Sequence, residues 1–151
     1  MQISRKADYA FRALTYLAAV NGKRTCNINE ISENENIPRE YLAKILKELT
    51  RQGFLTSFKG VNGGYLIARP RDQISFLDVL EAIQGPFVVS MCNLAGYDES
   101  ACKGKDRCAV HSFWGDLRQN LKKVLSEMTL AKIEYKKYYP VDTITAKPPS
   151  K

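Results

Sequence analysis

The sequence has few of the features that membrane proteins and secreted proteins need. No apolar run approaches the roughly 20 residues of a membrane-spanning helix. The first ten residues, MQISRKADYA, carry charges and lack the apolar segment of a secretory signal. We therefore expect a cytoplasmic protein without a membrane partner, in a compartment where thiols stay reduced and structural disulfides are rare.

Motifs of catalysis are also missing from the sequence. The chain has a single histidine and no C-x3-C-x2-C motif for radical chemistry. Its one glycine-rich stretch, KGVNGG, lies between two short β-type segments and not before a helix, where a phosphate-binding loop would lie. We expect neither an enzyme nor a protein with a small-molecule substrate.

Positive charge is in excess, and it is unevenly distributed. The net charge is +7, from 23 basic and 16 acidic residues. Residues 1–71 carry 12 basic and 6 acidic residues, whereas residues 72–131 carry 6 and 8, and residues 132–151 carry 5 and 2. A basic N-terminal half favours a phosphate backbone as partner, although a solvated basic surface would have the same composition.

The period of the apolar residues changes along the chain. It is helical up to residue 53, becomes short and β-like, and then returns to helical. Two helices joined by a tight turn and followed by a hairpin predict a winged helix-turn-helix, in a fold that is mainly α with a small β-hairpin wing. The expected helices are 4–22, 28–36, 37–53, 75–85 and 109–127, and the expected strands are 54–58 and 64–68.

Residues with special backbone preferences mark the ends of these elements. Ser4 and Ser75 are expected to cap helices, Pro38 fits a first helical turn, and Asn21-Gly22, Gly53 and Gly85 suit helix ends. Asn62-Gly63-Gly64 is expected to supply positive φ angles in the hairpin turn.

A set of polar and small residues predicts the DNA-reading surface. Helix 37–53 carries them on the face opposite its leucines, and the hairpin tip and the start of the first helix add more. Each would be unremarkable alone, and only their concentration on one helix and one wing favours DNA. The predicted contacts are Ser4, Arg5, Lys6, Arg39, Glu40, Tyr41, Lys44, Lys47, Arg51, Lys59, Gly60, Asn62 and Gly63.

The expected C-terminal helix has an apolar stripe that a small lobe would not cover. The stripe comprises Trp114, Leu117, Leu121, Val124 and Met128. We expect it to pack on a second copy, forming a homodimer that pairs two reading helices across a palindrome. The alternative is packing against the first helix of the same chain.

Three of the four cysteines lie in one segment and follow the spacing C-x9-C-x5-C, as Cys92, Cys102 and Cys108, with His111 three residues later. These residues alone are compatible with four interpretations: free thiols, a disulfide, a structural zinc site and an iron–sulfur cluster. The compartment disfavours the disulfide, and the absence of C-x2-4-C knuckles weakens the zinc interpretation. A cluster takes thiolates from a looser loop and would need a fourth ligand. Cys26 is interpreted as a small buried hydrophobe.

Four stretches carry a family resemblance. They are KADYAFRAL, IPREYLAKILKELTRQGFLTSFKGVNGGYLIAR, FLDVLEAIQGP and CAVHSFWGDLRQNLKKVLSEMTL. Together they span about residues 1–133, and through them the chain resembles the IscR/NsrR/RirA family of bacterial winged-helix regulators that carry iron–sulfur clusters. The last stretch is most similar to the IscR branch.

The resemblance implies a homodimer that binds double-stranded promoter DNA and responds to cluster, iron, nitric oxide or redox status. It implies Cys92, Cys102 and Cys108 as cluster ligands. The IscR pattern makes His111 the fourth ligand of a 2Fe–2S cluster, which we favour. The NsrR pattern would instead use Asp8 of the partner subunit, with a 4Fe–4S cluster. The gap between the first two cysteines is longer than is usual in IscR, and a zinc- or thiol-based winged-helix repressor without a cluster is the alternative.

These observations divide the chain into four expected segments. Residues 1–85 form the DNA-binding domain, and residues 86–108 form a cysteine-rich, cluster-binding loop. Residues 109–133 form the dimerisation helix, and residues 134–151 form a flexible basic tail.

Overall fold

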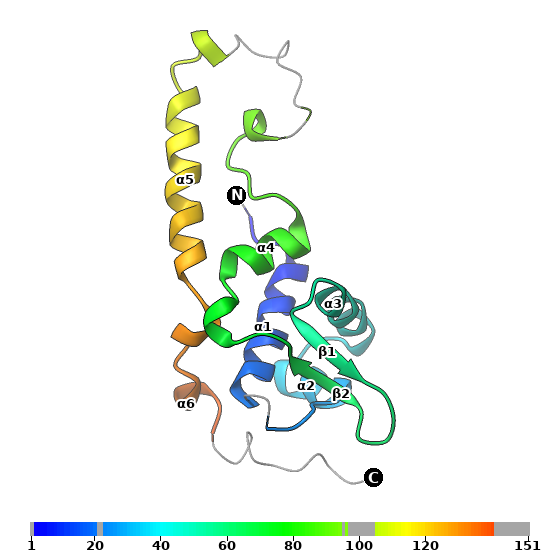
Figure 1. Ribbon diagram of the computed structural model, residues 1–151. Helices are drawn as coiled ribbons and strands as arrows, with labels where there is room; N and C mark the ends of the chain where they lie inside the picture. The colour runs from blue at the N-terminus through cyan, green and yellow to red at the C-terminus, as the bar shows by residue number, and fades with distance from the viewer. Residues whose placement is uncertain (1, 21–22, 95, 97–104, 141–151) are drawn as a thin grey trace.

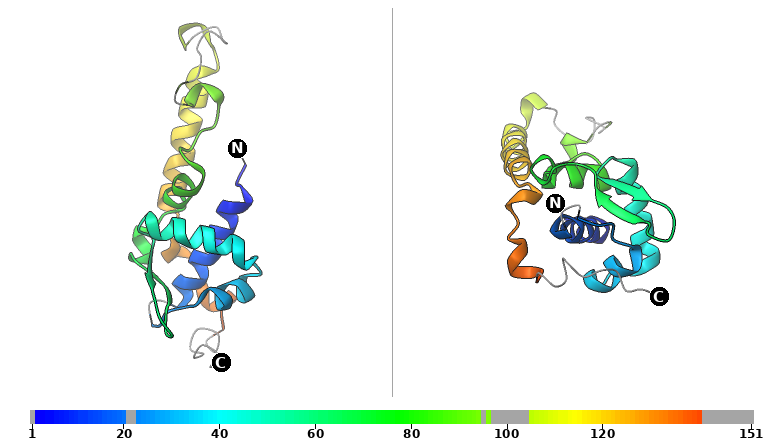
Figure 2. Two further views of the ribbon diagram at one scale, coloured as in Figure 1. Left: turned by 90° about the vertical axis from the view of Figure 1, so that its right-hand side faces the viewer. Right: turned by 60° about the horizontal axis from the view of Figure 1, so that its bottom comes forward.

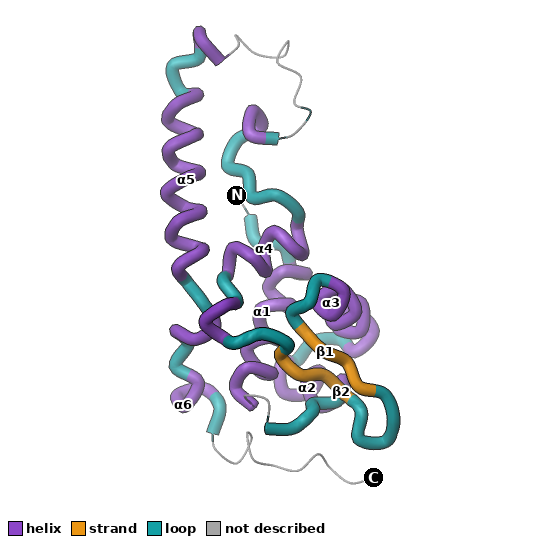
Figure 3. Tube along the Cα trace, in the orientation of Figure 1, coloured by secondary structure: helices purple, strands orange, loops and turns teal. Residues whose placement is uncertain are grey.

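The computed structural model describes residues 2–20, 23–94, 96 and 105–140. It is mainly helical, and the strands of the described residues form one antiparallel hairpin (Figure 3). The predicted fold class, mainly α with a β-hairpin wing, is confirmed. The helices are α1 (Arg5–Val20), α2 (Ile28–Glu35), α3 (Arg39–Arg51), α4 (Phe76–Gln84), α5 (His111–Glu127) and α6 (Tyr135–Tyr138), and the strands are β1 (Leu55–Phe58) and β2 (Gly64–Ile67).

Helix α1 is the centre of the core. The other helices and the hairpin surround it, as the right-hand view of Figure 2 shows. Nine of its 16 residues are buried, including five alanines, whose small side chains let neighbouring helices approach closely. We call α1 to α4 with the hairpin, residues 2–85, the reading head.

Helices α2 and α3 form the helix-turn-helix. Asn27 caps α2 by accepting a hydrogen bond from the Glu30 amide at 2.9 Å. Asn36 then takes a left-handed conformation with φ 49°, which asparagine tolerates, and this turns the chain toward α3. Pro38 was expected inside the first turn of α3 but lies just before it, at the N-cap, because its ψ of 125° is not helical.

The hairpin pairs β1 with β2 in an antiparallel register that runs from Leu55 opposite Ile67 to Phe58 opposite Gly64. Cys26 adds a bridge to Tyr65 on the other side of β2. Gly64 has φ +156°, and a Cβ there would lie 2.5 Å from the Cys26 carbonyl oxygen, so this position requires glycine. Of the three residues expected to have positive φ, Gly64 has it, whereas the expectation for Asn62 and Gly63 is wrong, and the turn has a second positive φ at Gly60, of +102°.

Helix α4 begins and ends as expected. Ser75 and Asp78 form a capping box, and Gly85 ends the helix with φ +85°. Beyond it, α5 runs along one side of the molecule and its N-terminal end stands beyond α4, at the end opposite the wing (Figure 1). Asn21-Gly22, the expected end of α1, lies outside the described residues.

The chain after α5 returns to the reading head. The Phe76 amide donates to the Met128 carbonyl at 2.8 Å, and the Leu130 amide donates to the Ile74 carbonyl at 3.0 Å. Leu130 is fully buried in the core, and Tyr135 on α6 is buried as well. Residues 134–140, assigned to a tail from their polarity, therefore pack on the core through tyrosine rings. Residues 141–151 lie outside the described part, and their flexibility stays a prediction.

Candidate DNA interface and cysteine segment

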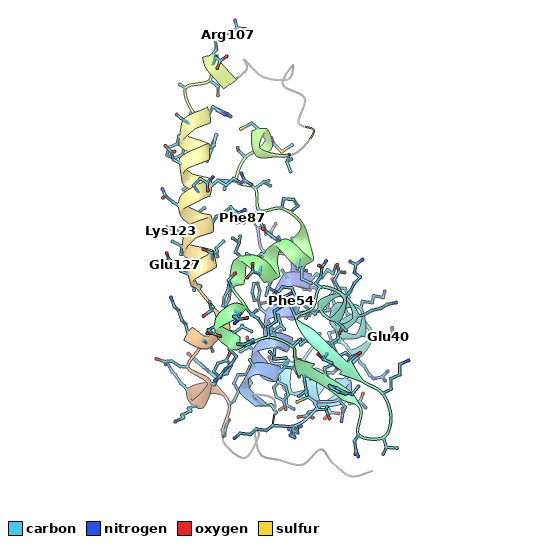
Figure 4. All side chains as sticks on the ribbon, viewed as in Figure 1. Glu40, Phe54, Phe87, Arg107, Lys123 and Glu127 are labelled. Carbon is cyan, nitrogen blue, oxygen red and sulfur yellow. The ribbon has the colours of Figure 1, made fainter. Side chains whose placement is uncertain are left out.

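The outer face of α3 has the composition predicted for a reading helix. Its leucines and isoleucine are buried, and the opposite face is exposed, as Figure 4 shows for Glu40, which points away from the side of Phe54. An amphipathic helix of this kind buries one stripe and leaves the other for a partner. The predicted contacts Arg39, Glu40, Tyr41, Lys44, Lys47 and Arg51 are all exposed on this helix.

The cations around α3 differ in their partners within the protein. Glu48 accepts from Lys6 Nζ at 3.1 Å and from Arg51 at 3.0 Å, so both cations are paired with one carboxylate. These hydrogen bonds, Lys6 first, hold the pKa of Glu48 below its usual value. Arg39 instead donates from Nε to the side-chain oxygen of Asn29, a neutral acceptor, at 2.7 Å.

Ser4 has a structural role that accounts for its position. Its hydroxyl accepts from the Ala7 amide at 3.2 Å, which caps α1 as expected. Its own amide donates to the Gln84 side chain at 2.7 Å, linking the start of α1 to the end of α4. Arg5, the next residue, is exposed.

The wing tip is exposed and is fixed at its base. Lys59, Gly60 and Asn62 are exposed, and Gly63 is half-buried. The Asn62 carbonyl accepts from the Thr25 hydroxyl at 2.9 Å, which connects the tip to the segment before α2. Thr25 and Asn29 were missed in the sequence because their roles depend on contacts between distant segments.

A buried polar cluster lies behind the wing. Arg24 makes two hydrogen bonds to Glu30, at 2.6 and 2.9 Å, and the Tyr16 hydroxyl donates to the same carboxylate at 2.7 Å. Burial, followed by the nearby Glu30 charge, raises the pKa of the fully buried Cys26 to about 12. The interpretation of Cys26 as a buried hydrophobe is confirmed, because its side chain is fully buried in the core.

The cysteine segment joins α4 to α5. Cys92 lies in the short 3-10 helix η2 (Met91–Asn93), and its sulfur is 3.0 Å from the Ser90 hydroxyl. Cys108 lies just after η4 (Lys105–Arg107), and its carbonyl accepts from the amide of His111, the first residue of α5. Cys92, Cys108 and His111 are half-buried, and neither described cysteine of the segment forms a disulfide.

The described part of the structure does not gather the predicted metal ligands that lie in it into one group. Within residues 2–20, 23–94, 96 and 105–140, no three His, Cys, Asp or Glu side chains are placed to hold a metal ion. Cys102 lies outside the described residues. Asp8, the alternative ligand, is exposed near the start of α1, 3.9 Å from Arg12. The ligand set therefore stays a prediction. Each candidate ligand among the described residues is at least partly exposed and so is accessible to a metal ion or cluster.

Helix α5 packs on α4 with one side only. Arg118 donates to the Phe87 carbonyl at 2.9 Å, and Lys122 pairs with Glu81 at 3.0 Å. No residue of α5 is buried. In the expected stripe Trp114, Leu117 and Leu121 are half-buried, whereas Val124 and Met128 are exposed. Two further apolar side chains, Val110 and Phe113, are also exposed.

Comparisons with known proteins agree with this architecture. Residues 3–135 match the Rrf2 family, described as "Iron-dependent Transcriptional regulator". The HTH-type transcriptional regulator IscR of Sodalis glossinidius (strain morsitans) is 32% identical over 133 residues, which are 88% of this chain and 78% of that protein.

Two solved structures share the fold. CymR (YrzC), the global cysteine regulator of B. subtilis, superposes with a TM-score of 0.70 at 24% identity, covering 87% of this chain and 94% of that chain. The oxidized form of Staphylococcus aureus CymR superposes with a TM-score of 0.66 at 26% identity, covering 86% and 93%.

The described residues contain no helix with the length and apolar composition needed to cross a membrane. The relatives are transcriptional regulators and not enzymes, as the missing catalytic motifs predicted. On the match over most of its length, the chain belongs to the Rrf2 family of transcriptional regulators.

Proposed function

We propose that this chain is a homodimeric, DNA-binding regulator whose cysteine segment binds an iron–sulfur cluster. The observation that carries the proposal is the position of Cys92 and Cys108. Both are free, half-buried thiols, and both lie in the segment that joins α4 of the reading head to α5. Similarity to proteins named IscR supports a cluster in particular.

The donor set suits a cluster better than a hard cation. Thiolates and imidazole are soft or borderline ligands, whereas magnesium and calcium prefer carboxylate oxygens. Cys92, Cys102 and Cys108 would hold the cluster, with His111 as fourth ligand or Asp8 of the partner subunit in its place. Such a group, when bound, supplies reversible electron transfer and reactivity toward oxidants. The hydroxyl of Ser90, 3.0 Å from the Cys92 sulfur, is placed to donate to a thiolate there.

A second candidate function is a thiol-based regulator without a cluster. It is favoured by likeness to a CymR whose structure is that of an oxidized form, and by the two accessible thiols themselves. A zinc site built from the same residues is a further possibility of this class. Iron and acid-labile sulfide distinguish the cluster from both.

The exposed side of α5 supports the homodimer. Apolar side chains at Val110, Phe113, Val124 and Met128 are each about half exposed, between 45% and 57%. A long helix with an apolar face on its open side is typical of a subunit interface. A second copy related by a two-fold axis would cover this face and place two α3 helices on one DNA site.

The cysteine segment is placed to control that arrangement. The C-terminal end of α5 is fixed to the reading head by the backbone hydrogen bonds at Phe76 and Leu130. Its N-terminal end follows Cys108 and stands beyond α4 (Figure 1). A cluster bound to the cysteine segment would therefore act on the N-terminal end of α5, and through the dimer on the spacing of the reading helices.

Anaerobic purification followed by iron, sulfide and visible-absorbance measurements tests the cluster. We expect colour with iron and sulfide in similar amounts, lost in Cys108→Ala and retained in the control Cys26→Ala, whose thiol is buried in the reading head. Protein that stays colourless after reconstitution contradicts the cluster and leaves the thiol-based regulator. Mössbauer spectra would separate a 2Fe–2S from a 4Fe–4S cluster.

Promoter binding by cluster-bound and cluster-free protein at one salt concentration tests the switch. We expect different affinities or sequence preferences for the two forms. Equal affinity and equal preference would remove the cysteine segment from the control of DNA binding.

A further inference from the structure

We propose that Arg39 reads a guanine in each half of the DNA site, and that Asn29 is the positioning residue that aims it. The inference adds a specific base contact to the proposed DNA binding, and it rests on that proposal. Arg39 is the first residue of α3, and in helix-turn-helix proteins the N-terminal residues of the reading helix contact base edges. Asn29 lies in the first turn of α2, so the pair connects the starts of the two helices.

The hydrogen bond between Arg39 and Asn29 uses only the Nε side of the guanidinium and leaves the Nη1 and Nη2 edge exposed. Arginine has five N–H donors, and here the single N–H of Nε donates to the Asn29 oxygen at 2.7 Å. Within the part of the chain that the structure describes, the four N–H groups of Nη1 and Nη2 remain for another partner. Two of them form a fork that matches O6 and N7 of guanine in the major groove, the commonest specific contact between arginine and a base. Asn29 thus fixes the plane of the guanidinium before DNA arrives.

The charge of Arg39 is also preserved, in contrast to its neighbours. Lys6 and Arg51 share the carboxylate of Glu48, at 3.1 and 3.0 Å, and a phosphate would have to compete with it. Arg39 has a neutral amide as partner, and among the described residues it has no acidic group within ion-pair distance. Its full positive charge therefore faces outward from an exposed side chain.

Fixing an arginine in this way favours a base contact over a phosphate contact. A phosphate contact tolerates a mobile side chain, because charge attraction depends little on orientation. A bidentate base contact needs the guanidinium plane to coincide with the base plane, so an arginine with its rotamers already restricted loses less entropy on binding. Among the other exposed cations of α3, Lys44 and Lys47 are suited to the phosphates as point charges.

Selection from random duplexes with the full-length protein, in cluster-bound and cluster-free forms, tests the inference. We expect a guanine in each half-site, and replacing it with adenine should weaken binding by about 5- to 150-fold. Arg39→Ala should remove this preference at that one position. Asn29→Ala should reduce it several-fold while leaving affinity for unrelated duplexes within about two-fold. Asn29→Asp keeps an acceptor oxygen and should keep the guanine preference, although its charge lowers affinity for every duplex.

Lys47→Ala is the matched control on the same exposed face. It should weaken binding to all duplexes equally and reduce the slope of log affinity against log salt by about 1. If Arg39→Ala behaves like Lys47→Ala, Arg39 is a phosphate contact and the inference is overturned. If Asn29→Ala keeps the full guanine preference, Asn29 does not position Arg39. Wild-type protein that selects no duplex would overturn the DNA binding itself, whereas selection unaffected by Arg39→Ala overturns only this inference.

Discussion

The two long helices, α1 and α5, have similar lengths and opposite environments. Helix α1 has 16 residues and buries nine of them, while α5 has 17 and buries none. Both carry apolar residues at helical spacing. The difference lies in their neighbours, because α1 is surrounded by the other elements of the reading head (Figure 2), whereas α5 contacts α4 on one side and leaves its other side open.

The contrast separates a part that is complete within one chain from a part that needs a partner. Burial of apolar surface stabilises the reading head without further contacts. On the open side of α5, four apolar side chains are exposed to water, and contact with a second copy of the chain would bury them. Stability should therefore depend on protein concentration through α5 and not through α1. The following four predictions test this contrast, in decreasing order of expected effect.

Alkaline pH should unfold the reading head. Burial raises the pKa of Cys26 and of Tyr135 to about 12, from usual values of 9.0 and 10.0, and it also raises the pKa values of Tyr16 and Tyr139. The unfolded chain releases these protons from about pH 9 upward while the folded chain retains them, so the free energy of unfolding falls as pH rises. None of these groups lies on α5. Urea denaturation between pH 8 and 11 should show the loss, and a constant midpoint would contradict it.

Truncating matched valines should have opposite consequences in the two helices. Val20 in α1 is 1% exposed and Val124 in α5 is 54% exposed. Val20→Ala should lower the free energy of unfolding by about 2 kcal/mol at any protein concentration. Val124→Ala should change it by less than about 0.5 kcal/mol in the separated chain but weaken the dimer. Denaturation and sedimentation at two concentrations measure both effects, and a stable dimer unaffected by Val124→Ala would exclude this face as the interface.

The C-terminal tyrosines should stabilise the reading head by a smaller amount. The Tyr139 hydroxyl donates to Glu35 at 2.8 Å, at the end of α2, whereas Tyr138 is 63% exposed. Burial raises the pKa of Glu35, although Tyr139 and then Arg12 oppose the rise, so the charged carboxylate relies on these partners. Tyr139→Phe should cost about 1 to 2 kcal/mol and Tyr138→Phe nearly nothing. Equal melting temperatures for the two variants would show that the hydrogen bond from Tyr139 to Glu35 does not stabilise the protein.

The ion pair between α4 and α5 should contribute least. Lys122 and Glu81 are partly exposed, at 28% and 34%, so we expect Lys122→Ala to cost about 0.2 to 1 kcal/mol, and less at high salt. Burial alone would raise the pKa of Glu81, but the Lys122 and Phe87 hydrogen bonds lower it overall. The contribution is therefore present above the usual value of 4.5 and is lost as pH falls below it. Lys123→Ala, an exposed neighbour labelled in Figure 4, is the control and should leave stability unchanged at every pH.

Several helix ends could be predicted from single residues because their causes are local. The capping box at Ser75 and the positive φ at Gly53 and Gly85 depend only on adjacent backbone, and the structure has them as expected. The hairpin turn was predicted less well. Gly64 is required by the Cys26 carbonyl, which comes from a segment 38 residues earlier, and no local pattern contains that contact.

The candidate site shows the same division. Exposure of the polar face of α3 follows from its apolar period, so its reading side chains could be listed from the sequence. The sequence could not show which of these side chains are paired with a carboxylate. Glu48 accepts from Lys6 of another helix, and Asn29 accepts from Arg39 across the turn. The packing of Tyr135 and Tyr139 was missed for a related reason, since a polar, basic segment gives no sign that Tyr135 is buried or that Tyr139 contacts Tyr16 of α1 and Glu35 of α2.

The sequence by itself determined the order of helices and strands, the amphipathic faces of α3 and α5, and the presence of three clustered cysteines. These follow from residue type and spacing, which act over one or two turns of chain. Only the tertiary structure decided which cations are paired with Glu48, which residue accepts from Arg39, and how the tyrosines after α5 pack on the reading head. Those properties depend on groups brought together from distant segments, and burial and pairing change the free energy of a charge or an apolar surface far more than its own neighbours in sequence do.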